Sequence, residues 1–148
     1  MIKNILIAID GSVLSNKAID YGLDLAEKFG ASITILNVFQ PVLLRGMIDQ
    51  SVFTPGSDAA INKDLLQFHD KLVTSTVEKA KMQKPNLSIA GMLKQGDPAQ
   101  QILDTAKTEG FDTIVMGARG ESGIQGLLMG SISDKVSKHA HCTVIVVK

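Results

Sequence analysis

The stretch that decides the fold is Asp112-Thr-Ile-Val-Met-Gly117-Ala-Arg-Gly120, and after nine further residues it continues as Gly130-Ser131-Ile132-Ser133. An apolar strand leads here into a glycine-rich loop, and the loop leads into a helix that opens with hydroxyl residues. This order places uncovered backbone N–H groups and the positive end of a helix dipole at the carboxyl end of a strand, where phosphate groups bind well. The stretch therefore predicts a nucleotide-binding domain, although binding alone does not establish catalysis.

Apolar runs and helical repeats alternate throughout the chain. Residues 3–9 and 32–38 are nearly continuous apolar or β-branched runs, which are typical of strands buried on both faces of a parallel sheet. Between them apolar residues recur at helical spacing, and Gly30 stands where a helix is expected to end. The expected apolar face of this helix consists of Leu14, Ala18, Tyr21, Leu25 and Phe29.

Three more helices and three more strands follow. A long helix is predicted over 60–84, with Ile61, Leu65, Phe68 and Leu72 on its apolar face. Asp97 is suited to cap the next helix, with Pro98 in the first turn and Gln100 at the reciprocal capping-box position. The last helix is predicted over 131–140. The predicted strands are 3–9, 32–38, 87–94, 113–116 and 143–147.

This alternation predicts one domain over residues 1–148, an α/β fold in which an open parallel sheet of five strands carries helices on both faces. Ligands bind such sheets beyond the carboxyl ends of the strands, where the strand order reverses. We expect the first and fourth strands to be neighbours there, because they are followed by Asp10-Gly11-Ser12 and by Gly117 onward. Between residues 39 and 59 the pattern is lost, and a loop of that length is usually functional or mobile.

The composition of the chain excludes several classes of protein. The 148 residues include fifteen basic and fifteen acidic ones, and no Lys/Arg run indicates a nucleic-acid surface. The single cysteine, Cys142, excludes an internal disulfide framework and fits a reducing compartment. The apolar start of the chain ends at Asp10, too early for a signal segment or a membrane span. A cytoplasmic protein is the default expectation.

The glycine-rich loop can be read in two ways. Gly117, Gly120 and Gly130 let a ligand approach the backbone closely, and we favour this interpretation. Alternatively the glycines only turn the loop, and Ser131 only caps the last helix, with Asp134 as its capping-box partner. The loop is not a Walker loop, because it lacks the phosphate-binding lysine. Arg119 is the one obvious cation, with Glu121 nearby, so we expect a triphosphate to need Mg²⁺ or to leave its tail in water.

Two motifs together resemble the universal stress protein family, in its nucleotide-binding branch. They are Ala8-Ile9-Asp10-Gly11-Ser12 at the first turn, and Met116-Gly117-Ala-Arg-Gly120 with Gly130-Ser131-Ile132-Ser133. The likeness covers the whole chain. It implies a Rossmann-like sheet of five strands, adenine nucleotide binding (ATP or AMP), homodimers formed through the last strand, and stress-related regulation.

The resemblance also implies roles for individual residues. Asp10 would bond the ribose or a phosphate-bound Mg²⁺, and the backbone of Val38 would meet the adenine edge. Met116 and Gly117 would lie along the ribose. Backbone N–H and hydroxyl groups of Gly120 and of residues 130–133 would hold the phosphates. The predicted nucleotide-binding set is Ile9, Asp10, Gly11, Ser12, Val38, Met116, Gly117, Arg119, Gly120, Gly130, Ser131, Ile132 and Ser133.

Other polar residues have simpler interpretations. Asp10 could also serve mainly to cap the first helix. His139 and His141 lie two apart without further ligands, so we expect no metal site from protein residues alone. Cys142 is expected to be a small buried apolar group, and His69 a surface or boundary residue. No catalytic residues are assigned.

The last strand, 143–147, has a further implication. If it lies at the sheet edge, its unpaired backbone groups would be satisfied by antiparallel pairing with a second copy. We therefore expect a homodimer with an unidentified regulatory protein partner. The leading hypothesis is a regulatory module in which nucleotide occupancy orders the 39–59 loop. The alternatives are a slow ATPase or phosphotransferase, and a dimeric interaction module with no nucleotide.

Overall fold

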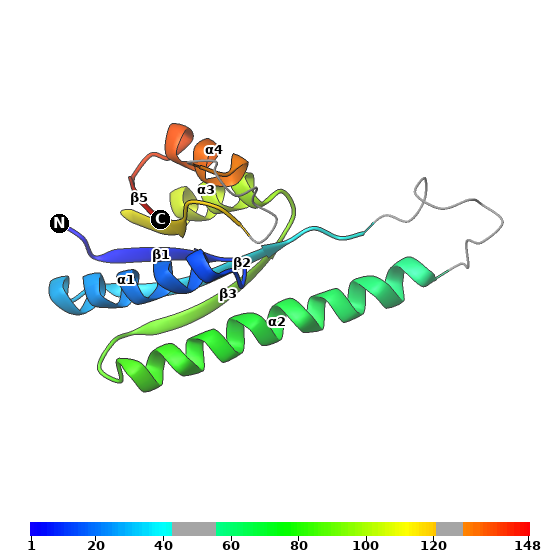
Figure 1. Ribbon diagram of the computed structural model, residues 1–148, viewed down its shortest axis with the longest axis horizontal. Helices are drawn as coiled ribbons and strands as arrows, with labels where there is room; N and C mark the ends of the chain where they lie inside the picture. The colour runs from blue at the N-terminus through cyan, green and yellow to red at the C-terminus, as the bar shows by residue number, and fades with distance from the viewer. Residues whose placement is uncertain (43–55, 121–128) are drawn as a thin grey trace.

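The computed structural model describes residues 1–42, 56–120 and 129–148. Five strands form one parallel sheet in the order β3-β2-β1-β4-β5 (Figure 1). The strands are β1 (Asn4–Ile9), β2 (Ser32–Phe39), β3 (Ile89–Gln95), β4 (Thr113–Gly117) and β5 (Thr143–Val147). The helices are α1 (Val13–Phe29), α2 (Ser57–Gln83), α3 (Pro98–Thr108) and α4 (Ser131–His139). The predicted fold class is confirmed.

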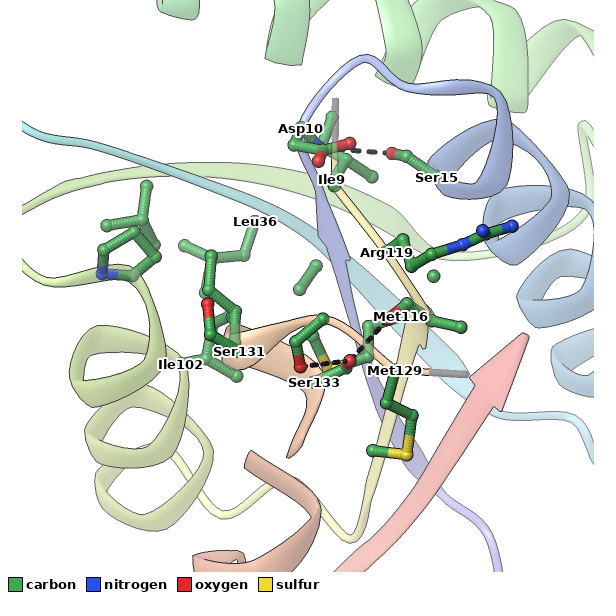
Figure 2. A pocket seen from close by; sticks show the side chains of 18 residues that line it. Ile9, Asp10, Ser15, Leu36, Ile102, Met116, Arg119, Met129, Ser131 and Ser133 are labelled. Carbon is green, nitrogen blue, oxygen red and sulfur yellow. Dashed lines mark hydrogen bonds between the residues drawn. The ribbon is translucent and has the colours of Figure 1, made fainter. Parts of the chain in front are cut away.

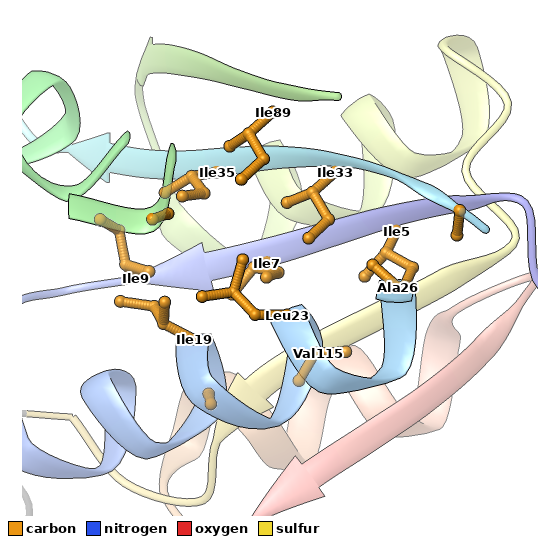
Figure 3. Packing of buried hydrophobic residues seen from close by; sticks show 13 residues of the cluster. Ile5, Ile7, Ile9, Ile19, Leu23, Ala26, Ile33, Ile35, Ile89 and Val115 are labelled. Carbon is orange, nitrogen blue, oxygen red and sulfur yellow. The ribbon is translucent and has the colours of Figure 1, made fainter. Parts of the chain in front are cut away.

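Helices cover both faces of the sheet, which explains why the central strands are apolar almost without interruption. On one face Ile5, Ile7, Ile33 and Ile35 pack against Ala18, Ile19, Leu23 and Ala26 of α1 and Ala80 of α2 (Figure 3). On the other face Leu6, Leu36 and Ile114 pack against Ile102 of α3 and Val136 of α4. Alternate residues of β1 and β2 therefore belong to different cores, as the two-residue period of a strand requires.

The buried face of α1 differs from the predicted one. Tyr21 and Phe29 are 48% and 45% exposed, so their assignment to the apolar face was wrong. A Cβ added at Gly22 would lie 2.4 Å from Cδ1 of Ile7, so α1 makes a close approach to β1 at this glycine. This approach turns Leu23 and Ala26 into the core instead. The prediction of Gly30 as the C-cap is confirmed by its φ of 68° and its helix-ending position.

The apolar face predicted for α2 is also wrong in part. Phe68 is 66% exposed and Ile61 is exposed, whereas Val73 and Ala80 are buried. The reason is visible in Figure 1, where the N-terminal half of α2 extends past the end of the sheet and only the C-terminal half lies over it. A sequence pattern reports apolar residues but not where the underlying sheet stops.

Boundaries and caps differ in detail. The helix predicted over 60–84 begins at Ser57, the strand predicted over 87–94 is Ile89–Gln95, and Phe39 still belongs to β2, which shortens the predicted loop. Residues 43–55 of that loop lie outside the described residues. Asp97 caps α3 as predicted, because its side chain accepts from the Gln100 N–H at 2.9 Å. The Gln100 side chain, however, donates to Asp104.

Candidate functional site

The strand order reverses between β1 and β4. The chain passes from β1 toward β2 and β3 on one side, and from β4 to β5 on the other. β1 and β4 are hydrogen-bonded neighbours, as expected, and their carboxyl ends lead into the two motif loops. A pocket of about 360 Å³ lies at this point (Figure 2). It is lined by Ala8, Ile9, Asp10, Ser15, Leu36, Val38, Pro98, Ile102, Met116, Gly117, Ala118, Arg119, Gly120, Met129, Gly130, Ser131, Ile132 and Ser133.

One side of the pocket is apolar. Leu36 and Val38 come from alternate positions of β2, on the face covered by α3 and α4, and Met116 comes from β4. Ile102 lies on α3, with Pro98 one turn before it at the start of the same helix. Leu36, Ile102 and Met116 are nearly fully buried, so the half-buried Val38 and Pro98 supply exposed apolar surface here. This surface suits a flat apolar group such as a purine ring, because binding would remove apolar surface from water on both partners.

Asp10 also lines the pocket, and it is held by the turn between β1 and α1. Its Oδ1 accepts the Ser12 N–H at 3.0 Å, and its own N–H donates to Oγ of Ser15 at 3.1 Å. Ser12, not Asp10, is the N-cap of α1, since its Oγ accepts the Ser15 N–H at 3.1 Å. The alternative that Asp10 caps the helix is therefore wrong. The φ of +84° at Gly11 allows this tight turn.

Gly120 lies directly against the Asp10 carboxylate. A Cβ added at Gly120 would be 2.7 Å from Oδ2 of Asp10, closer than real Cβ contacts. The glycine is needed here for close approach, because any larger residue would displace the carboxylate. The two motif loops, more than a hundred residues apart in sequence, therefore meet at these two residues.

The glycine loop is held together by the backbone of Ala118. Its N–H donates to the Val147 carbonyl at 2.7 Å, which ties the loop to the end of β5. Its carbonyl accepts the Gly130 N–H at 2.6 Å and the Ser133 hydroxyl, also at 2.6 Å. Ser133 is only 2% exposed, and Figure 2 shows its dashed hydrogen bonds at the bottom of the pocket.

This pairing changes the predicted roles at the start of α4. The N-cap is Gly130, and Ser131 is the first helical residue, so the predicted Ser131 cap was wrong. The Gly130 N–H and the Ser133 hydroxyl bond Ala118 in this conformation, so neither is directed to a ligand. The first bond within the helix is donated by Asp134 to the Gly130 carbonyl at 3.0 Å. The N–H groups of Ser131, Ile132 and Ser133 precede this bond, in the first turn, where N–H groups have no partner within the helix.

Few charges line the pocket. Among the described lining residues the charged side chains are Asp10 and Arg119. The Arg119 side chain extends away from Ser131 and Ser133 in Figure 2. Glu121, which the sequence places near it, lies outside the described residues. The helix start and backbone N–H groups are therefore the main positive elements beside Ser131.

Every residue of the predicted set except Gly11 and Ser12 lines the pocket, and these two shape the turn that holds Asp10. Their binding roles remain predictions. Sequence reasoning missed Ala8, Ser15, Leu36, Pro98, Ile102, Ala118 and Met129. The two-residue period of β2 could have indicated Leu36 once Val38 was chosen. Nothing local indicates Ile102, because α3 reaches the pocket only by packing on the sheet.

The other polar candidates lie apart from the pocket. Cys142 is half-buried, and burial raises the pKa of its thiol, with the nearby Asp112 charge acting in the same direction. Nδ1 of His139 bonds the Lys135 carbonyl of its own helix. In the described parts of the chain, no three His, Cys, Asp or Glu side chains are grouped to hold a metal ion. None of the described helices is long and apolar enough to cross a membrane.

The comparison with known families agrees with this geometry. The model of the universal stress protein family matches residues 1–148. The chain belongs to the universal stress protein family. Universal stress protein YxiE of Bacillus subtilis is 33% identical over 150 residues, which cover all of both chains. The resemblance stated from the sequence is therefore confirmed.

Solved structures of this family share the fold. The universal stress protein UspA of Lactobacillus plantarum has a TM-score of 0.82 at 25% identity, covering 99% of this chain and 97% of that one. A universal stress protein in complex with cAMP has a TM-score of 0.69 at 21% identity, with 99% and 96% covered. The protein of Archaeoglobus fulgidus in complex with dAMP has a TM-score of 0.66 at 17% identity, with 100% and 98% covered. At these last identities the likeness concerns the fold.

Proposed function

We propose that this universal stress protein is a regulatory module of the stress response that binds an adenine nucleotide, ATP or AMP, in the pocket between β1 and β4. The observation that supports this most is the combination within one pocket of an apolar wall, a carboxylate and a helix N-terminus. These three elements match the base, the sugar and the phosphate of a nucleotide. Two structural neighbours were solved in complex with an adenine nucleotide, one with cAMP and one with dAMP.

Each part of the nucleotide has a place in the proposal. The adenine lies against Val38 and Pro98, over the nearly buried Leu36 and Ile102. The ribose hydroxyls donate to the Asp10 carboxylate, because acidic groups at such strand ends commonly accept hydrogen bonds from a ribose. The phosphate accepts the N–H groups of Ser131 and Ile132 at the positive end of α4. The Gly130 N–H already donates to the Ala118 carbonyl, so a phosphate that approaches Gly130 would have to compete with that carbonyl.

The charge of the pocket favours a short phosphate chain. A helix start stabilises a nearby negative charge by about 0.3–2 kcal/mol, too little for three phosphates. Among the described lining residues, Asp10 is the carboxylate that could bind Mg²⁺. The ion would therefore take its other oxygen ligands from phosphates and water. We therefore expect AMP to bind without metal, and ATP to bind tightly only with Mg²⁺.

Calorimetric titration tests this proposal. AMP is expected to bind with and without Mg²⁺, ATP to gain affinity when Mg²⁺ is added, and GMP to bind more weakly than AMP. Absence of heat with AMP and with Mg²⁺–ATP at millimolar concentration would contradict nucleotide binding. Phosphate release over hours from Mg²⁺–ATP, lost in Asp10→Ala, would instead favour the slow ATPase.

A second candidate is an interaction module with no nucleotide. It is favoured by one observation, namely that the Gly130 N–H and the Ser133 hydroxyl already bond within the loop. A loop that satisfies its own donors needs no ligand to be stable. Mass spectrometry of small molecules released from the denatured protein distinguishes the two, since only the first function predicts an adenine compound.

The homodimer and the cytoplasmic location are part of the same proposal. β5 stands at the end of the strand order, so one side of it has no strand partner among the described residues. The Thr143 N–H and the Val147 carbonyl bond toward β4. Because backbone groups alternate in direction along a strand, those of Val144 and Val146 face the open edge. We propose that these groups pair with β5 of a second copy, and a monomer in light scattering at micromolar concentration would contradict this.

A further inference from the structure

A buried polar connection crosses the core on the face of the sheet opposite the pocket. Asn37 of β2 is 2% exposed and lies beside Ile9 in the strand register. Its Nδ2 donates to the Ile9 carbonyl at 2.7 Å. That carbonyl belongs to the peptide unit that joins Ile9 to Asp10. Asn37 therefore holds the last peptide group before the carboxylate of the candidate site.

His69 of α2 holds Asn37 in turn. Its Nδ1 lies 2.7 Å from Oδ1 of Asn37. A carbonyl oxygen can only accept, so the amide nitrogen of Asn37 must face Ile9 and its oxygen must face His69. It follows that Nδ1 of His69 carries the proton and donates it. The orientation of the amide and the tautomer of the ring are thus fixed by the same carbonyl.

Two aromatic rings fix the imidazole of His69. Phe39 stacks on it, with ring centroids 5.4 Å apart and an angle of 20° between the planes. Phe68 meets it edge-on at the same centroid distance, with an angle of 89°. Burial lowers the pKa of His69, so the ring is neutral at pH 7. Protonation would leave the Nδ1 donor in place.

A second contact brings α2 to the same turn. A Cβ built at Gly11 would touch both Cδ atoms of Leu72 at 3.7 Å. Leu72 lies three residues after His69 and therefore on a neighbouring part of the helix surface. α2 thus reaches the turn that contains Asp10 through a polar chain, and its Leu72 side chain lies near the backbone of Gly11.

We propose that His69 is a positioning residue of the pocket, which acts through Asn37 and the Ile9 carbonyl to fix the orientation of Asp10. This inference rests on the proposed nucleotide function and goes beyond it, because it couples the placement of α2 to the affinity of a site on the other face of the sheet. Without the His69 donor, Oδ1 of Asn37 loses its partner and the amide is free to turn away from Ile9. The turn then has to be ordered when ligand binds.

Two variants of His69 separate a positioning role from a packing role. His69→Asn retains an amide N–H attached at Cγ, as Nδ1 is in histidine, whereas His69→Leu is closer in volume to histidine and has no donor. The matched control is His139→Leu, which removes a histidine that bonds only its own helix at the surface. The melting temperature by circular dichroism verifies that each variant is folded.

The first readout needs no ligand. In two-dimensional NMR we expect the amide signals of Asp10 and Ser12 to move in His69→Leu, and to stay near their wild-type positions in His69→Asn and His139→Leu. Nitrogen-15 shifts of His69 should show a protonated Nδ1 and a bare Nε2. Unmoved Asp10 and Ser12 signals in His69→Leu, or the opposite tautomer, would overturn the inference whether or not nucleotide binds.

The second readout is AMP affinity by calorimetry. Loss of one hydrogen bond that orders the site should raise the dissociation constant of AMP about fivefold in His69→Leu. The dissociation constant of His69→Asn should stay within about twofold of wild type, because this variant keeps the donor. An equal loss of AMP affinity in both variants would mean that His69 acts by packing, and would overturn the inference. If the Asp10 signal moves but wild type does not bind AMP, the proposed function fails and the positioning of Asp10 stands.

Discussion

Ser133→Ala is the substitution that examines the geometry of the loop most closely. The Ser133 hydroxyl donates to the Ala118 carbonyl at 2.6 Å and lies 3.1 Å from the Gly130 carbonyl, in a buried position. Removing it leaves the Ala118 carbonyl with the Gly130 N–H, so no buried group becomes unsatisfied. The loss is then that of one ordinary hydrogen bond, about 0.5–1.5 kcal/mol of unfolding free energy.

Ser137→Ala is the matched control. It removes a hydroxyl from the same helix one turn later, where the bonds go only to carbonyls of α4 itself. Both substitutions carry a similar gain in helix propensity from serine to alanine, about 0.5 kcal/mol. The difference between the two variants therefore isolates the bond to Ala118.

Urea denaturation and thermal melting measure that difference. Ser133→Ala should be about 1 kcal/mol less stable than Ser137→Ala, which corresponds to a melting temperature lower by about 2–4 °C for a domain of this size. If the phosphate site depends on the loop, AMP affinity should fall about fivefold in Ser133→Ala alone. Equal stability of the two variants would refute the assignment of Ser133 as the residue that holds the loop.

Three further changes have defined outcomes. Gly120→Ala should weaken AMP binding about tenfold or more, because its Cβ would displace the Asp10 carboxylate, and wild-type affinity by calorimetry would contradict that contact. Burial alone would raise the pKa of Asp112, but hydrogen bonds from the N–H groups of residues 3 and 4 outweigh it and hold the pKa below the ordinary value. The Asp112 carboxylate thus adds stability above about pH 4, and this stability is lost as the pH falls further. In Asp112→Asn, the unfolding free energy measured by urea titration should fall less steeply with acid. An unchanged dependence of unfolding free energy on pH would contradict the lowered pKa of Asp112. Val146→Pro should yield a folded monomer in light scattering, because it removes an N–H that faces the open edge of β5, whereas a dimer would show that pairing lies elsewhere.

The strands, and the neighbouring position of β1 and β4, were predictable because they follow from short-range patterns and from the glycine motifs after these two strands. The nearly continuous apolar runs of β1 and β4 indicate strands covered on both faces, and the glycines after them indicate where the order reverses. The residues of the motif loops could be placed at one pocket for the same reason. Carboxyl ends of neighbouring parallel strands meet at one edge of the sheet.

Other features depend on contacts between distant segments and could not be predicted locally. Gly22 sets the rotation of α1 because Ile7 lies against it, and the sequence spacing of α1 alone favours a different face. The Ala118 carbonyl bonds Gly130 and Ser133, and the N-cap of α4 is Gly130 and not the expected Ser131. The hydrogen bond between His69 and Asn37 joins residues 32 positions apart, and neither local sequence predicts it.

The central claim is that an adenine nucleotide occupies the pocket between β1 and β4. Methyl NMR during a titration with AMP tests it most directly, since the two cores of the sheet carry separate sets of methyl groups. We expect saturating shifts at Leu36, Val38 and Ile102, with Ile33 and Ile35 on the opposite face nearly unmoved. Shifts concentrated on the opposite face, or none at millimolar AMP, would contradict it.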